Sequence, residues 1–154
     1  MKNAEQSFIK CARAFCCWVE SGRHELGDAR QHLLSLMQAV ANLRVGSVPT
    51  SDIEDFPRRG GDDPFIDHKR FAGLPFQYYR IVLLPFELND EEPAMGDLAD
   101  DLADIYGDLW HGLQALDSED KDYAIWYWRD SYSHWGHHAA AALYAIDEHL
   151  RANG

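Results

Sequence analysis

The sequence predicts an all-α protein: a bundle of four to five helices, with a long irregular loop between the second helix and the C-terminal helices. Three observations lead to this fold class. Apolar residues recur at spacings of three and four along the N-terminal segments, an apolar and a carboxylate stripe run in parallel through residues 97–109, and prolines and glycines interrupt residues 47–75. We expect one helical domain over 1–154, made of a helical hairpin at 1–46, the loop at 47–75 and the C-terminal helices at 76–154.

The N-terminal hairpin follows from two amphipathic segments separated by Ser21-Gly22. The first places these residues on one face: Phe8, Cys11, Ala12, Phe15, Trp18 and Val19. The second, expected over 23–44, does the same with Leu26, Ala29, Leu33, Met37, Val40 and Leu43, and Gly46 is placed to end it. Because the connection is short, the two helices should pack antiparallel.

Apolar residues show no periodic spacing in the loop at 47–75 that follows. An irregular connection of this length in a small domain is either a crossing loop or a functional lid. Its four apolar anchors are expected to be Phe56, Phe65, Ile66 and Phe71. Residues 76–84 are rich in Tyr, Ile and Val and could form a strand. A short helix is the preferred prediction, because no second segment looks able to pair with it.

Two long helices are expected at the C-terminal end. In the first, the apolar stripe is Leu98, Leu102, Ile105 and Leu109, and the carboxylate stripe is Asp97, Asp101, Asp104 and Asp108, shifted by about 100° around the helix. The last helix is predicted over 119–152, capped by Ser118 and bent at Gly136.

Composition excludes several classes of function. A net charge of -12 disfavours binding to nucleic acid and to anionic membranes. No apolar run is long enough for a membrane span, and no signal peptide is apparent at the N-terminus. The three cysteines, Cys11, Cys16 and Cys17, make a poor disulfide framework. We therefore expect a cytoplasmic protein.

The carboxylates and histidines allow a metal site. Asp101, Asp104 and Asp108 could converge with His134 and His138, which stand four residues apart, on one divalent metal ion in the bundle. A further candidate set on the second helix is His24, Asp28 and His32, with Glu20 from the first. The alternative is a solvated acidic face, which is the more frequent outcome in a chain with 26 acidic residues.

Arg129 lies among aromatic residues, and two roles are open for it. It could bind a ligand together with Trp126, or it could form a structural clamp by an ion pair with Asp101 or Asp104; the clamp is favoured. Trp128 and Trp135 are seven residues apart and are expected in the core, whereas His111 and His149 are expected at the surface.

Several motifs together resemble a family of uncharacterised bacterial proteins, domain of unknown function 5063. They are Tyr79 through Pro85-Phe86, Asp90-Glu-Glu-Pro93, Asp100-Asp-Leu-Ala-Asp-Ile-Tyr106, Trp126-x-Trp128-Arg129 and His134-Trp-Gly-x-His138, all in the last half of the chain. The resemblance implies a small, mostly helical bacterial protein and supplies no activity. Asp101-Leu-Ala-Asp104 is also similar to the Glu-x-x-Asp element of MazG-like all-α nucleoside triphosphate pyrophosphohydrolases, which implies magnesium-dependent hydrolysis. Their Glu-Glu-x-x-Glu element is absent, with Glu25-x-x-Asp28 as a partial counterpart.

Two functional hypotheses follow. The first and favoured one is a non-catalytic helical protein that binds a protein partner or associates with itself, since no complete catalytic set is visible. The second is a divalent-metal hydrolase of nucleotides or phosphoesters, with the helix-borne Asp and His residues on the metal and Arg129 on phosphate. A small-molecule pocket lined by aromatic side chains is a third alternative.

Overall fold

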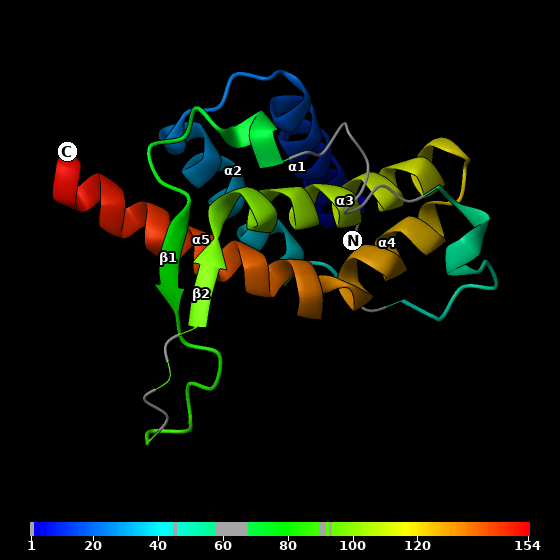
Figure 1. Ribbon diagram of the computed structural model, residues 1–154. Helices are drawn as coiled ribbons and strands as arrows, with labels where there is room; N and C mark the ends of the chain where they lie inside the picture. Colours follow the sequence, from blue (N-terminus) through cyan, green and yellow to red (C-terminus); the bar gives the residue numbers. More distant parts are fainter. Residues whose placement is uncertain (1, 45, 58–67, 90–91, 93) are drawn as a thin grey trace.

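Five α-helices form the body of the part of the chain that the structure describes, and one β-hairpin projects from this body (Figure 1). The structure is a computed structural model that describes residues 2–44, 46–57, 68–89, 92 and 94–154. The predicted all-α class is confirmed, with a two-stranded antiparallel sheet added to it. Within the described ranges, no helix combines the length and the apolarity needed to cross a bilayer.

Helices α1 (Lys2–Glu20) and α2 (Leu26–Ala41) form the expected hairpin. The turn between them contains Gly22 at a φ of 70°, a left-handed conformation that glycine adopts without strain. The second helix ends before Gly46. Its last turn closes with a hydrogen bond of 3.2 Å from the N–H of Asn42 to the carbonyl of Ala39 and one of 3.0 Å from the N–H of Leu43 to the carbonyl of Val40.

Helix α3 (Leu98–Asp117) is central and packs against α1, α4 and α5. Its start is fixed by Asp97, whose carboxylate accepts hydrogen bonds from the N–H groups of Ala99 at 3.0 Å and Asp100 at 3.3 Å. The predicted apolar stripe is fully buried: Leu98, Leu102, Ile105 and Leu109. The carboxylate stripe beside it is therefore held at a fixed angle to the core.

The single last helix predicted over 119–152 is wrong. Two helices occupy this range, α4 (Lys121–Asp130) and α5 (Tyr132–Asn153), and they break at Ser131. Gly136 does not bend α5; a Cβ at this position would collide with the ring of Tyr132, so the glycine provides room for that ring.

The cap predicted for the last helix is also corrected. Asp120 caps α4 by accepting a hydrogen bond of 3.0 Å from the N–H of Tyr123, whereas Ser118 is the C-cap of α3. An aspartate one residue before the helix competes successfully with the serine further upstream.

The short helix predicted over 76–84 is wrong as well. Strand β1 (Tyr78–Ile81) pairs with strand β2 (Ala94–Asp97), with Tyr79 opposite Gly96. The partner strand was not apparent in the sequence because Ala, Gly and Asp have low β propensity. Gly96 is accepted there because the Tyr79 ring lies directly over it, in space that a side chain would fill.

The loop between α2 and β1 is anchored at both described ends. It contains the 3₁₀ turns η1 (Ile53–Asp55) and η3 (His68–Phe71); Phe71 is 3% exposed and Phe56 packs on Tyr123. The other two expected anchors, Phe65 and Ile66, lie outside the described residues.

The expectation of an exposed His111 is wrong, because this side chain is fully buried and ties the loop to the helices. Its Nδ1 lies 2.9 Å from the carbonyl oxygen of Pro57, and its Nε2 lies 3.0 Å from the hydroxyl of Tyr123. His149 is half-buried against the ring of Phe76.

Candidate functional site

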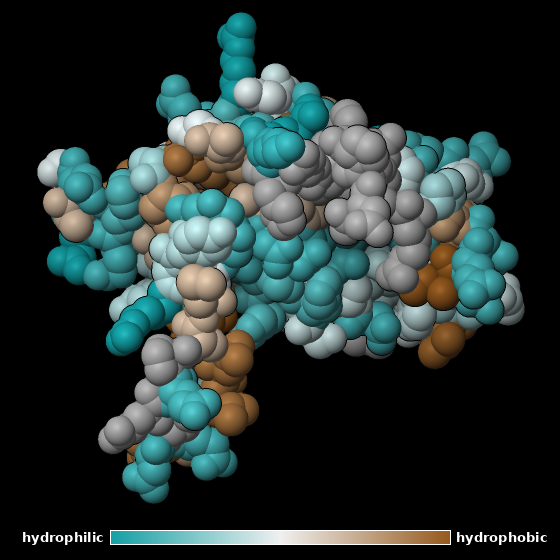
Figure 2. All heavy atoms as spheres, viewed as in Figure 1, coloured by the Kyte–Doolittle hydropathy of each residue, from teal (hydrophilic) through white to brown (hydrophobic). Residues whose placement is uncertain are grey.

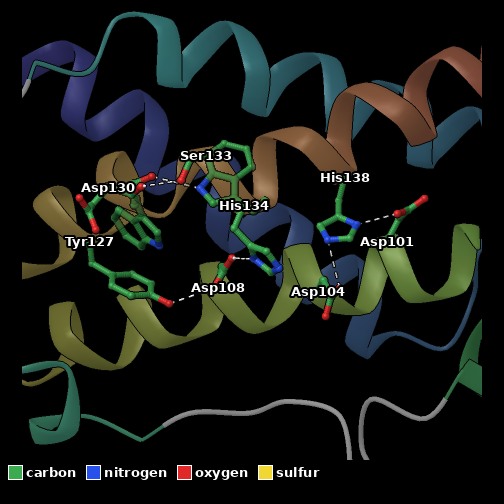
Figure 3. A network of polar contacts seen from close by, with 10 residues as sticks. Asp101, Asp104, Asp108, Tyr127, Asp130, Ser133, His134 and His138 are labelled. Carbon is green, nitrogen blue, oxygen red and sulfur yellow. Dashed lines mark hydrogen bonds and ion pairs between the residues drawn. The ribbon is translucent and has the colours of Figure 1, made fainter. Parts of the chain in front are cut away.

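The candidate site lies where α3 faces the first turns of α5 (Figure 3). The helical spacing of Asp101, Asp104 and Asp108 turns all three carboxylates toward α5, and the i, i+4 spacing of His134 and His138 turns both imidazoles toward α3. The two imidazole rings meet edge to face, with centroids 4.9 Å apart. All five residues predicted as metal ligands are thus close together.

His138 is held between two carboxylates. Its Nδ1 lies 2.7 Å from Oδ1 of Asp101 and its Nε2 lies 3.3 Å from Oδ2 of Asp104. The second oxygen of Asp101 accepts a hydrogen bond from the Tyr79 hydroxyl, which connects the site to the β-hairpin. Asp101 is 5% exposed, so these two donors compensate a carboxylate that is buried from solvent.

His134 forms a parallel pair with Asp108. Its Nδ1 lies 2.7 Å from Oδ2 of that carboxylate, while Oδ1 accepts a hydrogen bond of 2.9 Å from the hydroxyl of Tyr127 in α4. The His134 side chain is 57% exposed, whereas Asp108 is 12% exposed. This half of the site is therefore open to solvent on the imidazole side.

Hydrogen bonding, burial and neighbouring charges shift the pKa values of His138 and Asp104. The hydrogen bond to Asp101 raises the pKa of His138 above its usual value; partial burial opposes this, and the negative charge of Asp101 and Asp104 adds to it. Burial, followed by the nearby charge of Asp100, raises the pKa of Asp104, and the two histidines partly offset that rise. His138 and Asp104 therefore each bind a proton more readily than an isolated residue of the same type.

Three side chains of the site could share one metal ion. Asp104, His134 and His138 each offer a ligand atom, and these atoms all lie within 4.8 Å of one another. Because Nδ1 of each histidine is engaged by a carboxylate, Nε2 is the nitrogen left to face a metal. Histidine ligands of protein metal sites are commonly oriented by a carboxylate on the other ring nitrogen.

Arg129 does not form the expected clamp with Asp101 or Asp104, because His138 occupies that place. Its Nε is buried and has no hydrogen-bond partner among the described residues, and its guanidinium lies 6.0 Å from the centroid of the Tyr132 ring. Arg129 and Trp126 instead line a separate hollow of about 350 Å³.

Trp128 and Trp135 are fully buried. The indole N–H of Trp128 donates to the carbonyl of Leu109, and that of Trp135 donates to the carbonyl of Trp128, across the break at Ser131. Trp128 therefore ties α4 to α3, and Trp135 ties α5 to α4.

The second predicted set, which lies at the end of α1, in the following turn and on α2, has structural contacts. His24 lies within hydrogen-bonding distance of the carbonyls of Val19 and Arg70, and Glu20 accepts a hydrogen bond from Tyr106. His32 packs on Phe15 and Trp18, and burial lowers the pKa of its imidazole. In the described part of the chain, neither these residues nor Asp28 belongs to a group able to hold a metal ion.

Tyr79 and Tyr127 complete the site and were not predicted from the sequence. The hydroxyl of Tyr79, from β1, donates a hydrogen bond to Asp101, and the hydroxyl of Tyr127, from α4, donates one to Asp108. Tyrosines at such positions look like ordinary strand and core residues, so no signal in the sequence pointed to this role.

Comparisons with known proteins agree with the fold. A family model described as a domain of unknown function (DUF5063) matches residues 1–152, so the relationship covers the N-terminal half as well as the motifs noted in the last half. Among solved structures, a crystal structure of protein BF1032 from Bacteroides fragilis is similar, with a TM-score of 0.71 and 14% sequence identity over 92% of this chain and 89% of that one. No curated protein matches the chain. None of these matches supports the MazG-like resemblance, which stays a prediction.

Proposed function

The chain belongs to the DUF5063 family, a family of unknown function, and on this premise we propose that it binds a divalent transition-metal ion between α3 and α5. The ligands are Asp104, His134 and His138. The observation that carries the proposal is the convergence of their ligand atoms within 4.8 Å, with both histidines already oriented by carboxylates.

The chemistry of these ligands favours Zn²⁺ over Mg²⁺. Imidazole nitrogen suits zinc and other borderline metals, whereas magnesium prefers sites built from oxygen ligands and water. Asp101 and Asp108, expected at first as ligands themselves, are assigned the role of holding the two imidazoles. Three protein ligands leave a fourth coordination position for water or for a group of a binding partner.

A binding or regulatory role fits this site better than phosphoester hydrolysis. The hydrolase hypothesis assigned Arg129 to bind the phosphate of the substrate next to the metal ion. Arg129 lines the hollow beside Trp126 instead and makes no ion pair or hydrogen bond among the described residues. Hydrolysis by the metal-loaded protein remains a prediction, to be tested with p-nitrophenyl phosphate and nucleoside triphosphates.

Thermal unfolding with and without metal tests the proposal. A ligand at a hundred times its Kd stabilises the folded state by about 2.7 kcal/mol, which for a chain of this size raises Tm by roughly 5–10 °C. We expect this shift with ZnCl₂, a much smaller one with MgCl₂, and one bound zinc per chain by elemental analysis.

Matched variants locate the site. His134→Gln and His138→Gln should each abolish most of the zinc-induced shift, whereas His137→Gln should retain it, because His137 is an exposed neighbour outside the cluster. A zinc shift that survives both cluster variants, or no zinc shift in the unmodified protein, would show that the residues serve only as helix-to-helix contacts.

A further inference from the structure

The β-hairpin continues into an arm that carries an unusual number of exposed apolar side chains. The arm is defined here by its described residues 78–89, 92 and 94–97. Its exposed apolar residues are Tyr78 (58%), Val82 (73%), Leu83 (56%), Leu84 (56%), Phe86 (93%), Leu88 (91%) and Met95 (73%). Figures 1 and 2 show the arm reaching away from the helices, with apolar side chains along it.

The exposed area is of the size of a protein interface. Large apolar side chains present roughly 150–250 Å² each, so at these exposures the seven together present on the order of 1,000 Å². The largest apolar patch of a typical monomer is about 300–600 Å², and a standard interface covers about 800 Å² on each partner. A two-stranded sheet with free edges is also marginal by itself and gains from a covering partner.

A receptive surface lies at the base of the same arm. A hollow of about 330 Å³ is lined mainly by the rings of Phe76, Tyr78, Tyr79, Tyr144 and His149, together with Arg80, Ala145 and Glu148. Tyr144, from α5, is 69% exposed there. An aromatic side chain such as Phe86 would find tilted and edge-to-face ring partners in this hollow.

One pair of charges on the arm is complementary in a reversed copy, formed by Arg80, the arm's single basic residue, and Glu87. Arg80 at the base and Glu87 further out are both exposed, and neither side chain forms an ion pair or hydrogen bond within the described chain. Residues 81–86 between them carry no charge. When two arms lie antiparallel about a twofold axis, the base of each arm faces the outer part of the other. Arg80 of each copy then faces Glu87 of the other copy, so the pair forms twice in the dimer.

We propose that the protein forms a twofold-symmetric dimer in which the two arms pack antiparallel, with Phe86 of each copy seated in the aromatic hollow at the base of the other copy's arm. The contact is isologous, so one surface supplies both the inserted ring and the hollow that receives it. The two proposals share one residue, because Tyr79 lines the hollow and its hydroxyl also holds Asp101. The three proposed metal ligands, Asp104, His134 and His138, do not line the hollow.

Sedimentation velocity and light scattering of the full chain from 1 to 200 µM test the dimer. We expect a mass of twice 17.6 kDa for the unmodified protein. The double variant Phe86→Ser/Leu88→Ser should weaken the dimer at least a hundredfold in Kd, because two of its most exposed anchors no longer bury apolar surface. Val48→Ser, which removes an apolar residue outside the arm that is 77% exposed, should leave the mass unchanged.

Charge reversal distinguishes a second copy from any other partner. Arg80→Glu and Glu87→Arg should each weaken the dimer by about tenfold, because the pair occurs twice, and the double reversal should restore it. All these residues are exposed, so circular dichroism should show unchanged folding. A monomer at 200 µM, a dimer that survives Phe86→Ser/Leu88→Ser, or a double reversal without recovery would each overturn the proposal.

Discussion

Replacing Asp101 by asparagine tests whether the carboxylate–histidine pair stabilises the fold in a pH-dependent way. Asparagine keeps the size of the side chain and an oxygen for the Tyr79 hydroxyl, and removes the negative charge that faces Nδ1 of His138 at 2.7 Å. Both partners are largely buried, with 7% and 20% of their side chains exposed, so solvent screens the interaction little.

The size and sign of the effect follow from the raised pKa of His138. A histidine whose pKa is higher in the folded than in the unfolded state contributes stability that is complete below the unfolded value near 6.5. This contribution disappears as the pH rises through the folded-state pKa. A hydrogen bond between charged groups contributes roughly 1.5–3 kcal/mol, and a neutral one roughly 1 kcal/mol. Asp101→Asn should therefore lower the free energy of unfolding by about 1.5–3 kcal/mol at pH 6 and by about 1 kcal/mol at pH 9.

Urea unfolding followed by tryptophan fluorescence, with a chelator present, measures both values. Asp100→Asn is the matched control: it removes a charge from the same helix turn without a hydrogen bond to His138. Tyr79→Phe should cost the same at both pH values, because burial and Asp101 raise the pKa of that phenol far above pH 9. Equal losses for Asp101→Asn at pH 6 and pH 9 would refute the reasoning.

Three further changes test the packing around the site, each by urea unfolding. Gly112→Ala should cost about 1–3 kcal/mol, because its methyl group would collide with the indole of Trp128; a neutral result would mean that the two helices separate easily. Arg129→Gln should change stability by less than about 1 kcal/mol, whereas a buried clamp to Asp101 would lose roughly 3–5 kcal/mol. Tyr127→Phe should cost roughly 1 kcal/mol by removing a donor from Asp108, and no loss would show that water replaces the hydroxyl.

The fold could be predicted from the sequence wherever a periodic apolar stripe decides the local structure. The stripe of α3 and the hairpin of α1 and α2 are of this kind, because their burial depends on spacing alone. Strand β2 could not be predicted, since its Ala-Met-Gly-Asp sequence has low strand propensity and its fit to β1 depends on Gly96 leaving room for the ring of Tyr79. Tertiary packing overrides propensity at that point.

For the candidate site, the sequence identified the residues and misjudged their partners. Helical spacing correctly grouped the three aspartates of α3 and the two histidines of α5. It could not show that His138, rather than Arg129, reaches Asp101, because that depends on how far α5 is rotated relative to α4. Sequence periodicity describes one helix at a time, and the angle between two helices is set by the side chains packed between them.

The second half of the site is built from both sides of the break at Ser131. Tyr127 and His134 are seven residues apart, and in a straight helix their Cα atoms would be separated by roughly 10.5 Å along the axis. Both nevertheless contact the two oxygens of one carboxylate, that of Asp108, at 2.9 and 2.7 Å. Because α4 ends at Asp130 and α5 begins anew at Tyr132, the two side chains can approach the same aspartate from different helices. The Asp108 carboxylate therefore links α4 to α5 across the break, with Tyr127 bound to one of its oxygens and His134 to the other.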